Sequence, residues 1–109
     1  MKALLLSVLV VGAAAAGQPK DRTFTGTITD EMCATGDHSH MRMGPTDGEC
    51  TNACVIAHGA EYVLSAGKDV YRLSDQKAPE EFAGQRVAVV GTLDPRTKTI
   101  RVESIAAAR

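Results

Sequence analysis

Two hairpin signals in the second half of the chain constrain its fold most. Residues 61–75 and residues 85–106 each contain two runs rich in β-branched and aromatic residues, separated by turn residues around Gly67 and Pro95. A further run, residues 22–30, alternates apolar residues and glycine with threonines, as a half-buried strand does. The sequence therefore predicts five short strands.

Two helical segments are expected between these strands. Residues 51–59 fit about two turns of helix that begin near Thr51 or Asn52 and stop at Gly59, and residues 78–84 fit one short helix. We therefore predict a mainly β, five-stranded OB-like barrel. It has a short helix between strands three and four, and a Cys/His/Met-rich insert with a helix between strands one and two. Another small β-barrel or a sandwich is the alternative.

The N-terminal segment has the composition of a secretory signal peptide. Lys2 precedes an apolar run from Ala3 to Val11, and small residues follow. The run is short for a membrane anchor, and no cysteine follows the small residues to carry a lipid. We expect a signal peptide of residues 1–16, one OB-like domain of residues 17–109, and a periplasmic or secreted protein without membrane contact after cleavage.

Charge and aromatic content argue against nucleic-acid binding. The chain has 12 basic and 13 acidic residues, four aromatic residues and no basic cluster, whereas phosphate backbones require clustered Lys and Arg. No serine elbow, phosphate-binding glycine loop or HExxH motif is present either. Asp30 and Glu31, at a strand end, are expected to be solvated or to cap a turn. We therefore predict no enzyme and no nucleic-acid partner.

The predicted insert concentrates the soft and imidazole side chains of the chain. All three cysteines and all three histidines lie within residues 33–58, in the connection that belongs to the usual binding face of OB barrels. Thiolates and thioethers select Cu(I), and imidazoles with thiolates suit zinc or copper. Cys50, Cys54 and His58 are spaced four residues apart and would share one face of the predicted helix. The candidate metal ligands, for copper or zinc, are Cys33, His38, His40, Cys50, Cys54 and His58.

A disulfide is the competing interpretation, because exported cysteines tend to be oxidised. A bridge between Cys50 and Cys54, one helical turn apart, would be strained. A bridge from Cys33 to Cys50 or to Cys54 would instead close the insert and stabilise the domain by about 3 kcal/mol. The loop lengths do not decide between these pairings. In this interpretation the insert is structural, and the module binds a small molecule or an exported protein partner without catalysis.

Other side chains of the insert have structural interpretations. His58, near a helix C-terminus, suits the helix dipole. Met41 and Met43 are two residues apart, and both are expected to pack the loop against the barrel. Met32 is expected in the core. Metal binding and a stapled loop both remain open at this point.

The framework of the chain carries a family resemblance in five stretches: GTITDEMC, CTNACVIAHGAEYVL, VYRLSD, FAGQRVAVVGTLD and TIRVESI. These stretches resemble a group of small exported bacterial proteins, a domain of unknown function that is similar to bacterial OB-fold modules. The resemblance implies the fold class and export. It implies no catalytic residue.

Overall fold

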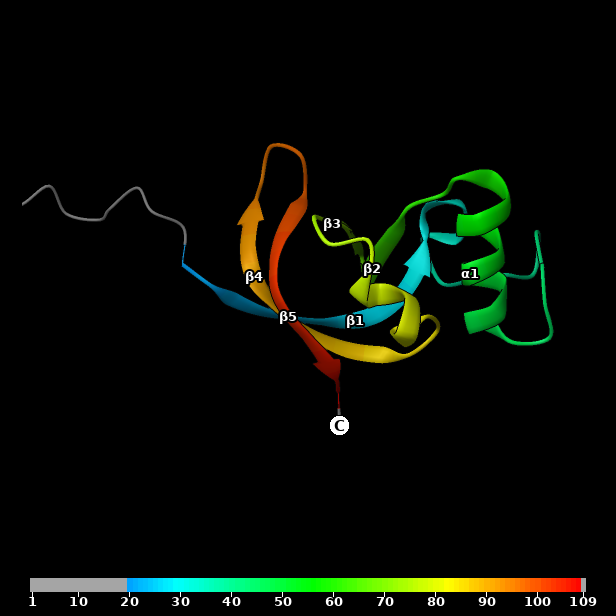
Figure 1. Cartoon of the computed structure of the whole chain (residues 1–109). Coiled ribbons are helices and arrows are strands. Elements are labelled where there is room, and N and C mark those ends of the chain that lie inside the picture. Colours follow the sequence, from blue (N-terminus) through cyan, green and yellow to red (C-terminus); the bar gives the residue numbers. More distant parts are fainter. Residues whose placement is uncertain (1–19, 109) are drawn as a thin grey trace, which may run out of the picture.

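The computed structural model describes residues 20–108 (Figure 1), so the predicted signal peptide, residues 1–16, lies outside the described residues. A mainly β chain with five strands is confirmed. No helix within residues 20–108 is long and apolar enough to cross a membrane. The elements in chain order are β1 (Arg22–Asp30), η1 (Glu31–Cys33), α1 (Asp47–His58), β2 (Tyr62–Ala66), β3 (Asp69–Leu73), η2 (Ala78–Phe82), β4 (Arg86–Asp94) and β5 (Thr99–Ala107).

The five strands hydrogen-bond in a closed ring in the order β1-β2-β3-β5-β4 (Figure 1). β1 closes the ring because it pairs on both sides, with β4 through residues 22–27 and with β2 through residues 27–30. β3 and β5 are parallel and pair only through Arg72 with Thr99 and Leu73 with Ile100. The other neighbouring strands are antiparallel.

The hydrophobic core fills the inside of this ring. In β1 the predicted alternation holds as far as Ile28, because Phe24 and Ile28 are buried while Thr25 is exposed and Thr27 is half-buried; the last two residues of the strand are buried as well. Burying a side chain of this size stabilises the fold by about 1.5–3 kcal/mol. The Phe24 ring meets Tyr71 of β3 edge-on, with 5.2 Å between ring centroids. The buried core residues are Phe24, Ile28, Tyr62, Leu64, Leu73, Val87, Val89 and Ile100.

The helix of the insert, α1, begins earlier than predicted, at Asp47 rather than near Thr51. A capping box starts it: the Glu49 N–H donates to Thr46 Oγ1, and the Thr46 N–H donates to Glu49 Oε2, both at 3.2 Å. These bonds satisfy backbone N–H groups that have no partner within the helix. The predicted end at Gly59 is confirmed, with φ at +65° in the left-handed region that glycine tolerates.

The short helix predicted between the third and fourth strands is a 3-10 helix, η2. Within the described part of the chain, α1 is the one α-helix, and it lies between β1 and β2. Asp75 draws the chain into η2, because its Oδ1 accepts the N–H groups of Lys77 and Ala78 at 2.8 and 3.1 Å. Five residues allow only short-range bonds such as Glu80 N–H to Lys77 O, 3.2 Å.

Two glycines and one hydrogen bond hold α1 against the chain after η2 and against β2, and Figure 1 shows the helix beside the ring of strands. A Cβ on Gly48 would lie 2.6 Å from the carbonyl oxygen of Ala83, and one on Gly84 would lie 2.6 Å from the Gly48 nitrogen. The helix therefore contacts the chain after η2 backbone to backbone. Farther along α1, the Tyr62 hydroxyl donates to Asn52 Oδ1 at 2.6 Å.

Candidate metal centre

Two cysteines and one histidine from three different segments meet between α1 and the end of β1. Cys33 ends η1, His38 lies in the following loop, and Cys50 lies near the start of α1. The two sulfurs and a ring nitrogen of His38 all lie within 4.8 Å of one another, and the residues are 5%, 3% and 0% exposed. We call these residues the trio. Thiolate and imidazole ligands of this kind bind zinc and copper.

Asp30 turns the chain so that Cys33 enters the trio. Its Oδ1 accepts the N–H groups of Met32 and Cys33, both at 3.0 Å, and so caps η1. The expectation of a capping role is therefore confirmed, but the side chain is buried rather than solvated. Its second oxygen, Oδ2, has no hydrogen-bond partner among residues 20–108. A buried carboxyl group thus holds the backbone of Cys33, one member of the trio.

His38 is oriented through both of its ring nitrogens. Nδ1 lies 3.2 Å from Cys50 Sγ, and Nε2 lies 3.5 Å from Thr29 Oγ1. Because the Thr29 hydroxyl gives its only proton to the carbonyl of Cys33, at 3.0 Å, it accepts from Nε2–H. With the proton on Nε2, the lone pair of Nδ1 points toward the sulfurs. Histidines that bind metals are held by a second hydrogen bond in the same way.

The sulfur of Cys50 is surrounded by polar groups of the loop. The N–H of Met43 donates to it at 3.3 Å, and the carbonyl oxygen of Met41 lies 3.4 Å away. Cys54, one turn later, is buried on the same helix face as Cys50, as predicted, and its sulfur lies 3.6 Å from that of Met43. Cys54 adjoins the trio without belonging to it.

All three cysteines are free thiols in the structure. Neither predicted bridge, Cys33 to Cys50 or Cys33 to Cys54, is formed, and disulfide pairing in the exported protein stays a prediction. Of the two pairings, Cys33 with Cys50 joins sulfurs that already lie within 4.8 Å. The geometry therefore favours that pair if a bridge forms.

Burial and negative charge hold two of these thiols in their protonated form. The pKa of Cys54 is raised to about 11, first by burial and then by the charges of Asp30 and Cys50. The pKa of Cys33 is raised by burial and by Asp30 in the same order. Since thiolates are the ligands of metals, binding at this site must release thiol protons.

Comparison with known proteins places the second half of the chain in a family. A family described as "Protein of unknown function (DUF5818)" matches residues 54–108, just over half of the chain. The chain belongs to this family. No curated protein and no solved structure matches this DUF5818 chain. The family match begins at Cys54, so it covers strands β2 to β5, and the trio lies before it.

Two histidines predicted as ligands lie outside the trio. His58 is exposed in the last turn of α1, because one helical turn carries it about 6 Å along the axis beyond Cys54. His40 is also exposed and faces a neighbouring cavity. The six predicted ligands therefore divide into the buried trio, the adjacent Cys54, and these two surface histidines.

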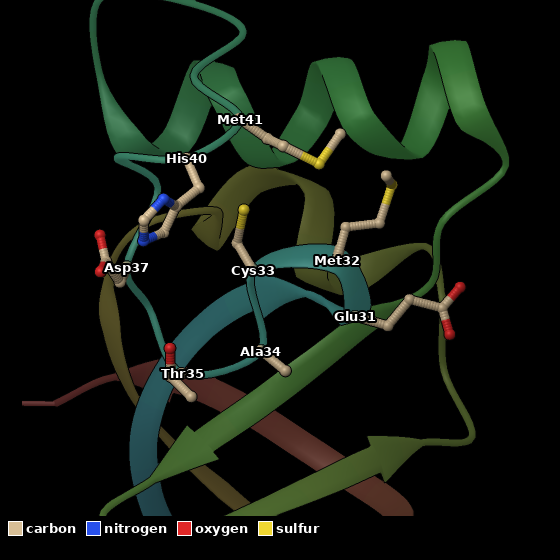
Figure 2. Close-up of a pocket in the computed structure, with 8 residues that line it drawn as sticks. All are labelled: Glu31, Met32, Cys33, Ala34, Thr35, Asp37, His40 and Met41. Carbon is tan, nitrogen blue, oxygen red and sulfur yellow. The ribbon is translucent and has the colours of Figure 1, made fainter.

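A cavity of about 490 Å³ adjoins the trio (Figure 2). Met32 and Met41 flank it, 42% and 41% exposed, so the prediction that Met32 belongs to the core is wrong, and Met41 does not lie buried against the strands. Because η1 turns the chain sharply after β1, adjacent residues point to opposite sides, Cys33 inward and Met32 outward. The lining residues are Glu31, Met32, Cys33, Ala34, Thr35, Asp37, His40 and Met41.

Sequence reasoning missed that Thr29 and Asp30 support the site: Thr29 was not singled out, and Asp30 was predicted as a possible turn cap but not as a buried neighbour of Cys33. Thr29 belongs to a strand in which threonines were expected on the solvent side, yet it is buried because β1 ends under α1. A signal was present for the cap: an Asp at the end of a strand and before a short turn is a typical capping residue. Neither residue is recognisable as a metal-site support without the position of α1.

Proposed function

We propose that this chain is an exported small binding protein that holds one transition-metal ion, copper or zinc, between Cys33, His38 and Cys50. The observation that carries the proposal is the buried approach of two thiols and one imidazole within 4.8 Å. On binding, each coordinating thiol releases its proton and the sulfur takes the metal instead. The role is non-catalytic.

The surroundings of the trio support metal binding over incidental packing. His38 has its Nε2 directed at Thr29, which leaves Nδ1 for a metal, and the Met43 N–H stabilises charge on the Cys50 sulfur. A purely apolar cluster would need neither contact. Cys54 and the thioether of Met43 lie next to Cys50 and add soft sulfur to the same side.

The proposal includes the fold family and the location of the protein. The closed strand order β1-β2-β3-β5-β4, with β1 paired on two sides, supports an OB-like barrel. In such a barrel the insert with the trio occupies the connection between the first two strands. The signal-like composition of residues 1–16 supports export to the periplasm or beyond the cell.

A matched pair of histidine variants tests the metal site. Affinity for Zn²⁺ and for Cu(I) is measured under reducing, anaerobic conditions by competition with a chromophoric chelator. We expect His38→Ala to weaken binding by more than the roughly 10–100-fold that losing an outer-shell partner costs, because it removes a ligand itself. His58→Ala, at the exposed end of α1, should bind like the wild type. Equal affinities for the two variants, or a wild type that takes neither metal, would overturn the proposal.

The second candidate is the disulfide-stapled binding module, and the approach of Cys33 to Cys50 favours it. A bridge between them would use two sulfurs of the trio, so the oxidised protein should bind no metal. Thiol titration of protein from an oxidising compartment, after unfolding without reductant, separates the two: a stapled module yields one thiol, and a reduced metal site yields three.

A further inference from the structure

A buried metal site needs a route by which the ion enters. The members of the trio are at most 5% exposed, so the ion cannot reach them directly from solvent. Cys33 is the member that also lines the cavity of Figure 2, and several other residues of that lining are exposed. The cavity therefore leads from the surface to one of the ligands.

The open side of the cavity carries soft ligands. Three large hydrophobic side chains are strongly exposed within the described part of the chain, and two of them, Met32 and Met41, line this one cavity. Figure 2 shows their sulfurs turned toward the same space as the Cys33 sulfur, with the His40 imidazole at the other side. Exposed apolar residues are ordinary when scattered, but paired thioethers beside a thiol form a soft donor set.

Negative charge at the rim favours a cation over a neutral ligand. Glu31 and Asp37 both line the cavity and are exposed. Carboxylates around a concave surface raise the local concentration of cations.

We propose that this cavity is an entry port for Cu(I), in which Met32, Met41 and His40 receive the ion and pass it to Cys33. The inference rests on the proposed metal site and specifies its cargo, since neutral thioethers suit a soft monovalent ion. Transfer is a ligand exchange: bonds from copper to thioether or imidazole break, and a bond to the Cys33 sulfur forms. The Cys33 proton leaves to solvent, and copper stays Cu(I), so no electron moves.

The rate of copper loading tests the port. The reduced full chain is mixed anaerobically with the Cu(I) complex of bicinchoninate, and the loss of the complex's absorbance is followed by stopped flow. In the double variant M32L/M41L, leucine keeps the apolar bulk and removes the sulfurs. We expect loading at least about tenfold slower than in the wild type, with the same final occupancy. His40→Asn, a change at an exposed position, should also slow loading.

The control is Ile56→Leu, an equally conservative change at a 79% exposed position on α1 that does not line the cavity. It should load like the wild type. Unchanged rates in both port variants would overturn the port and leave the metal site standing. A double variant that also loses final occupancy would overturn it, because the thioethers would then be equilibrium ligands. A wild type that takes Zn²⁺ but not Cu(I) would overturn the port alone, and one that takes neither would overturn both proposals.

Discussion

The Nδ1 atom of His38 lies 3.2 Å from the sulfur of Cys50, and this contact ties the loop after β1 to the start of α1. The other ring nitrogen reaches Thr29 of β1. One buried imidazole thus joins the strand, the loop and the helix of the insert. It orders the loop before any metal arrives, which lowers the entropy cost of assembling the site.

Replacing His38 should therefore destabilise even the metal-free protein. His38→Ala removes one buried contact from Cys50 and one from Thr29 and leaves a cavity where the imidazole packed, so we expect a loss of about 1–3 kcal/mol in the free energy of unfolding. His40→Ala, an exposed change two residues away, should stay within about 0.5 kcal/mol of the wild type. Urea unfolding of the reduced, chelator-treated protein measures both. Equal stabilities would show that the His38 contacts contribute nothing.

Asp30→Asn should make the buried thiols more acidic. The negative charge of Asp30 raises the pKa of Cys33 and of Cys54, so removing it shifts both toward the ordinary value of 9.0. The asparagine carbonyl can still accept the backbone N–H groups that cap η1. The measurement is the pH profile of iodoacetamide alkylation in the folded, metal-free protein, which should move to lower pH. The control Asp69→Asn, an exposed change on β3, should leave the pH profile unchanged. If the profile of Asp30→Asn is also unchanged, the charge of Asp30 does not raise the pKa of these thiols.

The metal-free protein should lose stability in alkali. The pKa of Cys54 is about 11 in the folded chain, against an ordinary value of 9.0. Above pH 9 the thiol therefore ionises more readily in the unfolded chain than in the folded chain, and this ionisation favours unfolding. A raised folded-state pKa contributes stability that is complete below pH 9 and is lost as the pH rises through 11, by about 2 kcal/mol. Cys54→Ala should flatten this slope in urea unfolding between pH 8 and 11.

Tyr62 provides the check on that slope. Burial raises the pKa of its hydroxyl, with the charge of Glu80 adding to the effect, so Tyr62 titrates in the same direction. Tyr62→Phe removes this contribution and keeps the thiol. An alkaline slope that persists in Cys54→Ala and disappears in Tyr62→Phe would assign the loss to the phenol alone.

The strands could be predicted from sequence because each carries its own local signal. Residues 22–30 alternate along a single half-buried strand, and both hairpins contain turn residues at the observed positions. The start of α1 was predicted too late, although Thr46 and Glu49 form the pattern of a capping box. Gly48, which lies between them, is more typical of a loop than of a helix. A glycine is needed at this position because the helix backbone contacts Ala83 there.

The members of the metal site could be predicted only as a set. Spacing places Cys50, Cys54 and His58 on one helix face, but it cannot show that α1 ends in solvent beyond Cys54. Nor can spacing decide which loop histidine turns inward. That choice depends on Thr29, whose hydroxyl is buried because β1 runs under the helix. Long-range packing, which no local pattern contains, selected His38 over His40.

The sign of the stability change in Gly48→Ala tests whether α1 packs against the chain after η2. Its φ is not in the left-handed region, so in an isolated helix Gly48→Ala would stabilise by about 1 kcal/mol. Here the added Cβ would lie 2.6 Å from the carbonyl oxygen of Ala83, and overpacking of this kind costs about 1–3 kcal/mol. We expect net destabilisation in urea unfolding and weaker metal binding, because α1 carries Cys50 away from Cys33. Ala57→Gly, at an exposed position of the same helix, calibrates the intrinsic helix preference. A more stable Gly48→Ala protein would mean that α1 does not rest on the chain after η2.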